Sequence, residues 1–123
     1  MEFSIHQENW FSTPIWESEV KNINNQEIKD YCLYLKDNTK GVNISNRGGW
    51  HSSEILLPMP QDLRSLFSNL EVFVNEHCFK EMGVPNLKFG NFWVNINYPG
   101  AYNLAHDHQS SILSGVYLSL IHI

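Results

Sequence analysis

Cysteine, positive charge and long apolar runs are all scarce in this sequence. Its two cysteines, Cys32 and Cys78, are too few for a disulfide scaffold and lack the C-x-x-C spacing of a redox or zinc motif. Lysine and arginine number 8 against 13 acidic residues, and the net charge of −5 argues against nucleic acid as a partner. No stretch approaches the ~20 apolar residues of a membrane span, and the N-terminus, MEFSIHQENW, does not resemble a signal peptide. We therefore expect a cytoplasmic protein with no membrane partner.

What the sequence does contain is enough apolar material for one small folded domain. Its 123 residues are 42% hydrophobic and 13% aromatic, which favours a packed core over disorder. Residues 11–20 predict an edge strand, because Pro14 confines that strand to the edge of a sheet. Asn24 predicts a helix start, with Glu27 completing a pattern like a capping box, and residues 37–41 end this helix.

A long loop and a second helix are expected next. Residues 40–60 predict the loop, and loops of this length are often functional. Prolines at 58 and 60 open the second helix, whose apolar stripe continues to about Met82, before Gly83 ends it. His77, near the end of this helix, is interpreted as a histidine that is either solvated or stabilises the helix dipole, rather than as a ligand.

The central stretch is residues 91–117, NFWVNINYPGAYNLAHDHQSSILSGVY. It predicts a strand, a turn at Pro99-Gly100, a second strand with His106 and His108, and the start of a third strand. On an extended strand, residues at i and i+2 leave the same face, so the two imidazoles would form half of a metal site. Asp107 would point to the other face. The alternatives are two half-exposed strand histidines, or one structural imidazole bonded to a carbonyl.

One face of the first strand in this stretch could line a polar pocket. Strand alternation places Phe92, Val94 and Ile96 on one side, and Trp93, Asn95 and Asn97 on the other. An aromatic ring and two amides suit a pocket wall, whereas a solvent face with one exposed tryptophan is the other interpretation.

These motifs carry a resemblance to a known family. The block W-V-N-I-N-Y-P-G-A-Y-N-x-x-H-x-H-x-x-S-x-L-S-G-V-Y resembles the prolyl-hydroxylase-like 2-oxoglutarate/Fe(II)-dependent oxygenases of phage and marine bacteria. The stretches SNRGGWHS at 45–52 and TPIW at 13–16 are similar to earlier parts of that family. Tyr102 and His106 match its pattern, but His108 stands where that pattern has aspartate. A three-histidine site and a register in which Asp107 is the ligand both stay open.

The resemblance implies an α+β fold: N-terminal support helices plus the first strands of a double-stranded β-helix (jelly-roll), incomplete. It also implies a hydroxylase-type dioxygenase that uses Fe(II) as cofactor and 2-oxoglutarate as a small-molecule co-substrate. His106 and His108 would be metal ligands, and Tyr102 and Asn95 would bind the co-substrate. Arg47 and Trp50 could contact the substrate, although a plain turn with a buried tryptophan also explains residues 47–51.

The family's third ligand and its carboxylate-binding basic residue lie downstream of the S-G-V-Y block. We therefore expect residues 1–117 to be the N-terminal part of a single oxygenase-like domain, inactive as given. Residues 118–123, LSLIHI, equal the translation of a transposase adapter used in shotgun sequencing. They are expected to be a non-native tail, so His122 is not counted as a ligand, although the tail also alternates like a real strand. The competing functional classes are a cupin-like metal-binding jelly-roll and a phage structural module.

Overall fold

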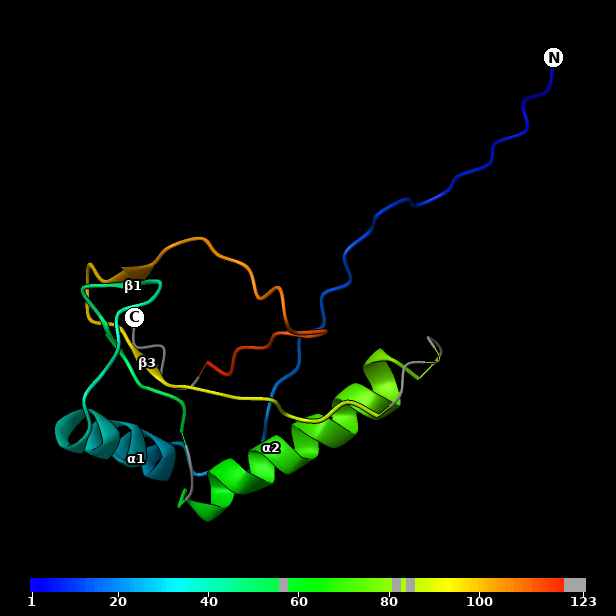
Figure 1. Cartoon of the computed structure of the whole chain (residues 1–123). Coiled ribbons are helices and arrows are strands. Elements are labelled where there is room, and N and C mark those ends of the chain that lie inside the picture. Colours follow the sequence, from blue (N-terminus) through cyan, green and yellow to red (C-terminus); the bar gives the residue numbers. More distant parts are fainter. Residues whose placement is uncertain (56–57, 81–82, 84–85, 119–123) are drawn as a thin grey trace.

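The fold is α+β, with two helices on one side of a set of short antiparallel strands (Figure 1). A computed structural model describes residues 1–55, 58–80, 83 and 86–118. Most of the residues expected to form a tail at 118–123, including His122, lie outside this range. The order of elements is helix, two strands, helix, then two more strands. The α+β class is therefore confirmed.

Helix α1 (Asn25–Asn38) begins where the capping pattern predicts. The Asn24 side-chain oxygen accepts a hydrogen bond from Glu27 N at 3.1 Å, which satisfies one of the free amides of the first turn. At the other end Thr39 N donates to Leu35 O at 2.8 Å, and Thr39 then turns to an extended conformation. The helix therefore ends inside the predicted stop at residues 37–41.

Helix α2 (Gln61–Phe73) starts directly after Pro60, as predicted, but ends well before Met82, which itself lies outside the described range. A single π-helical segment, η1 (Val74–Cys78), follows it. The Asn75 side chain donates to Glu71 O at 2.8 Å, the carbonyl that a continuing α-helix would offer to the Asn75 amide. This side chain therefore competes with the regular helix pattern where α2 gives way to η1.

The core lies between the two helices. Ile28 from α1 and Leu63 and Leu66 from α2 form its buried centre, and Tyr117 packs against it from the C-terminal part of the chain. Asn24 N donates to the Asp62 carboxylate at 2.7 Å, so the starts of the two helices are also joined by a charge-assisted hydrogen bond. Burying each of the three aliphatic side chains contributes about 1.5–3 kcal/mol to stability.

The predicted loop at 40–60 contains two short strands that pair with the central stretch. Strand β1 (Asn46–Arg47) pairs antiparallel with β4 (Tyr102–Asn103), and β2 (Trp50–His51) pairs antiparallel with β3 (Asn95–Ile96). Two-residue strands have no alternation that a sequence can reveal, and their partners lie some fifty positions away, so the sequence predicted only a loop.

The turn at Pro99-Gly100 is present, but β3 and β4 do not form a hairpin with each other. Ala101 N donates to Tyr98 O at 2.9 Å, and Gly100 has a φ of +87°, as the third position of a type II turn requires. β3 and β4 instead belong to two separate two-stranded sheets, each paired with part of segment 46–51. Five residues, 97–101, thus stand opposite Gly48 and Gly49, and the turn projects from the paired strands.

The N-terminal segment, residues 1–22, starts far from the body of the molecule and passes beside it before it enters α1 (Figure 1). It is exposed at every position and carries no strand, so the edge strand predicted at 11–20 is wrong. No neighbouring strand within the described residues supplies a ladder of hydrogen bonds to this segment. The Trp16 ring does lie 5.8 Å from the Phe79 ring, just past η1. Neither α1 nor α2, nor any other described helix, is long and apolar enough to cross a bilayer.

Candidate metal centre

His106 and His108 come together, although not on a strand. Both lie just past the end of β4, in a segment with neither helix nor strand, so the predicted strand stops short of them. Their ring centres are nevertheless 4.9 Å apart, with the ring planes at 82° to each other. His106 is exposed and His108 is half-buried.

The spacing of the two rings is compatible with one shared metal ion. His106 Nδ1 lies 2.7 Å from Leu104 O, and because a carbonyl can only accept, this nitrogen carries the proton in the neutral ring. The lone pair is then on Nε2, which is free to bind a metal. Two imidazoles that share a metal through bonds of about 2.1 Å have ring centres roughly 5 Å apart, close to the spacing of this pair.

No third ligand joins these two histidines within the described part of the chain. Over residues 1–55, 58–80, 83 and 86–118, no group of three His, Cys, Asp or Glu side chains is placed to hold a metal ion. Asp107, between the two histidines, is exposed, and its carboxylate accepts a hydrogen bond from Gln109 Nε2 at 3.2 Å. The site is therefore a two-imidazole pair, which is open on its remaining sides.

Trp93 and His51 extend this pair into a row of four rings. The centre of the Trp93 ring lies 5.7 Å from that of His108. Trp93 also stacks on His51, with ring centres 5.5 Å apart and an interplanar angle of 14°. His51 is opposite Asn95 in the β2–β3 pair, so their side chains lie on the same face. Trp93, two residues before Asn95, points to that face as well. The sequence placed Trp93 and Asn95 on one face, but did not single out His51.

The other predicted site residues lie on the same paired strands. Tyr102 is opposite Arg47 in the β1–β4 pair and is 56% exposed, so its hydroxyl is accessible to a small molecule. Arg47 donates through Nη1 to Ile44 O at 3.2 Å and to Asn46 O at 2.9 Å. Asn95 is also exposed.

Trp50 lies on the opposite face of the strands from His51. It pairs with Ile96 and packs beside Gly41, where an added Cβ would meet the indole nitrogen at 2.6 Å. The interpretation of residues 47–51 as a turn with a packed tryptophan therefore agrees with the position of Trp50, which is half-buried.

Both cysteines are structural in this fold. Cys32 is half-buried on α1 and Cys78 is buried in η1, and both are free thiols. Burial raises the pKa of the Cys32 thiol, and it also raises the pKa of the Cys78 thiol. Since the thiolate is the metal-binding and nucleophilic form, this shift disfavours the reactive form of both thiols.

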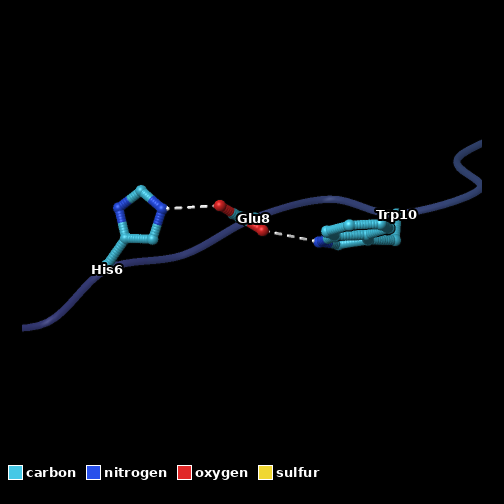
Figure 2. Close-up of polar contacts among 3 residues, drawn as sticks. All are labelled: His6, Glu8 and Trp10. Atoms are coloured by element: carbon cyan, nitrogen blue, oxygen red, sulfur yellow. Dashed lines mark hydrogen bonds and ion pairs between the residues drawn. The ribbon is translucent and has the colours of Figure 1, made fainter.

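Two other polar clusters lie away from the histidine pair. In the exposed N-terminal segment, His6 Nε2 lies 2.9 Å from the Glu8 carboxylate, and Trp10 Nε1 donates to it at 2.7 Å (Figure 2). The contact with His6, and then that with Trp10, lowers the pKa of Glu8. This cluster is local to its segment, because its three residues span only five positions.

The second cluster borders a hollow of about 430 Å³ beside α2 and η1. Asn75 lines this hollow, and its side-chain amide donates to Leu87 O at 2.9 Å and accepts from Leu87 N at 2.7 Å. The side chain thus pairs with segment 86–88 as a strand would. The hydrogen-bonding groups of Asn75 are therefore used by the fold.

Comparison with known proteins adds no relative. Neither a scan against family models nor searches of curated proteins and of solved structures found a match to this chain.

Proposed function

We propose that this chain is part of an Fe(II)/2-oxoglutarate-dependent dioxygenase of the hydroxylase type. The observation that carries the proposal is the pair His106 and His108, with ring centres 4.9 Å apart and with His106 Nε2 left free by the contact of Nδ1 with Leu104 O. Imidazole suits Fe(II), and an open-sided site is what oxygen-activating iron enzymes require.

The chain's own residues would bind and orient the reactants. His106 and His108 would hold the metal, while Tyr102 and Asn95, both exposed, would hydrogen-bond the co-substrate. Arg47, beside Tyr102 in the β1–β4 pair, would bind an anionic group of the substrate, with Trp50 as a more distant contact. Fe(II), when bound, supplies open coordination positions for the 2-oxoglutarate chelate and for dioxygen.

The finer architecture belongs to the same proposal. β1 to β4 would be the first strands of a double-stranded β-helix, with α1 and α2 as support helices on the outer face of one sheet. The antiparallel pairing and the one-sided position of the helices support this arrangement (Figure 1). The third ligand and the basic group that binds 2-oxoglutarate would come from outside the described residues.

The first test is a Ni(II) titration of the 123-residue chain by calorimetry. Ni(II) is the probe because imidazole pairs bind later first-row metals more tightly than iron. His106→Ala and His108→Ala should each lower the affinity about tenfold or more, since each removes one of two ligands. The matched control is His77→Ala, an exposed histidine in η1, which should change nothing. Binding should also weaken as the pH falls, because protons compete for the imidazole nitrogens.

A second measurement separates the dioxygenase from a simple metal binder. Adding 2-oxoglutarate should tighten Ni(II) binding, whereas glutarate, which lacks the keto oxygen needed for chelation, should not. A Ni(II) affinity that does not change when 2-oxoglutarate is added would favour the cupin-like alternative instead. If neither histidine variant weakens binding, the proposal is wrong. If His108→Ala binds normally and Asp107→Ala does not, the carboxylate register is correct.

Turnover can be measured on the same chain with Fe(II), ascorbate and 2-oxoglutarate, by following succinate. We expect none, because the described residues bring together only two ligands. Turnover that disappears in His122→Ala would mean that the tail supplies the third ligand.

A further inference from the structure

The His108 ring is in contact with a stack of two other rings. Trp93 lies 5.7 Å from His108 and stacks on His51 at 5.5 Å, with the indole and the His51 imidazole nearly parallel at 14°. This stack lies on the face of β3 opposite to Phe92, whose ring instead packs at 4.3 Å against Phe67 of α2. It is therefore separate from the helix-packed core.

The far end of the stack is held firmly by the paired strands. His51 is only 5% exposed, and its Nδ1 lies 2.6 Å from Ser52 O. The buried Ser52 in turn exchanges two hydrogen bonds with Val94, from Ser52 N to Val94 O and from Val94 N to Ser52 Oγ, both at 2.9 Å. Ile55 N also donates to Phe92 O at 3.3 Å, so Trp93 lies between two hydrogen-bonded positions, Phe92 and Val94.

The two histidines of the pair are held differently. The His106 ring is fixed by its contact with Leu104 O at 2.7 Å. Within the described residues, the His108 ring is held instead by its neighbours, Trp93 and His106. Aromatic contacts of this kind have a preferred geometry and stabilise one ring orientation over others.

We infer that Trp93, supported by His51, is a positioning residue that orients the His108 imidazole for metal binding. The inference rests on the proposed function, because it takes His106 and His108 to be the ligands. Trp93 itself does not touch the metal in this arrangement. It lowers the conformational cost that binding would otherwise impose on His108, as hydrogen-bonded neighbours do for ligands in other metal sites.

The test is a Ni(II) titration of Trp93 variants in the 123-residue chain. Trp93→Leu, which keeps an apolar side chain but removes the flat ring, should lower Ni(II) affinity about threefold to tenfold. Trp93→Phe should restore most of it. The matched control is Trp10→Leu, because Trp10 is 74% exposed in the N-terminal segment, where its indole donates to Glu8. This control should bind Ni(II) as the parent does.

A double-mutant cycle identifies the route of the effect. In a His108→Ala background, Trp93→Leu should have no further effect, because the ring that Trp93 orients is gone. An equal loss of affinity in both backgrounds would mean that Trp93 acts through general stability, and would overturn the inference. If the histidine variants weaken binding but Trp93→Leu does not, the inference fails while the proposed function stands. If the histidine variants have no effect, both fail.

A metal-free measurement covers the case in which Trp93→Leu disturbs folding. The ring protons of His108 should show an indole ring-current shift in the nuclear magnetic resonance spectrum of the parent chain. Trp93→Phe should reduce this shift, and His51→Leu should alter it by releasing the indole from its support. A His108 spectrum that is insensitive to His51→Leu would overturn the supporting role of His51.

Discussion

Replacing Gly49 by alanine should disrupt the register of the strands that carry the candidate site. Gly49 lies where the pairing changes from β1–β4 to β2–β3. A Cβ added there would collide with the side-chain oxygen of Asn97 and would lie 3.0 Å from Ile96 O, which is part of the backbone of β3. The close approach of the two segments therefore requires glycine at this position.

The size of the effect follows from what must move. Asn97 Nδ2 donates to Asn103 Oδ1 at 3.2 Å, a hydrogen bond that joins the two sides of the projecting turn. Swinging Asn97 aside would lose that bond, at about 0.5–1.5 kcal/mol, because an exposed hydrogen bond contributes only modestly. Moving the β3 backbone adds an overpacking cost of about 1–3 kcal/mol. We expect a total of about 1.5–4.5 kcal/mol, or roughly tenfold to two-thousandfold in a local opening equilibrium.

Amide hydrogen exchange is the suitable assay because it reports local opening residue by residue. Protection of the Ser52 and Val94 amides, which bridge the strands, should fall by that factor in Gly49→Ala. Protection of the Thr39 amide, which closes α1, should stay constant. Gly115→Ala is the control, since a Cβ there meets nothing within 4 Å. Unchanged protection in Gly49→Ala, or an equal loss in Gly115→Ala, would refute the reasoning.

Two further predictions concern stability. Tyr31→Phe should leave the free energy of unfolding unchanged or raise it by up to about 1 kcal/mol in urea titrations, because the buried Tyr31 hydroxyl has no hydrogen-bond partner within the described residues. A measurable loss of stability would contradict this prediction. Burial raises the pKa of Cys32, Cys78, Tyr31 and Tyr117 above ordinary values of 9.0 for the thiols and 10.0 for the phenols. Above those values the unfolded chain has lost protons that the native chain retains, so the free energy of unfolding should be constant up to about pH 8 and fall as the pH rises further. Urea titrations followed by circular dichroism measure this profile. A free energy of unfolding that stays constant to about pH 11 would contradict the prediction.

The parts of the fold that the sequence predicted are those controlled by local contacts. The start of α1 follows from Asn24 and Glu27, which are three positions apart, and the start of α2 follows from Pro60. The end of α2 was predicted too late. The apolar stripe continues past Phe73, but the side chain of Asn75 bonds both to Glu71 O and to the backbone of Leu87, twelve residues away. A contact of that range leaves no periodic signal in the sequence.

The candidate site was predictable in part for the same reason. His106 and His108 are two positions apart, so their proximity survives even though the strand expected to carry them ends at Asn103. The position of His51 depends instead on the register between β2 and β3. That register is set by Gly48 and Gly49 standing opposite the five residues of the turn, and an offset of one residue would move His51 to the other face.

The two faces of the β2–β3 pair carry different sets of side chains, and the candidate site lies beside one of them. Ile96 and Trp50 occupy one face, and Phe92, further along the same segment, packs on α2 through Phe67. His51 and Trp93 occupy the other face, beside His108. Because neighbouring residues on a strand point to opposite sides, the helices can stabilise the first set without covering the second. The geometry of the histidine pair therefore depends on the register of the strands more directly than on the helix core. A variant that shifts the register should lose metal binding even where α1 and α2 stay intact.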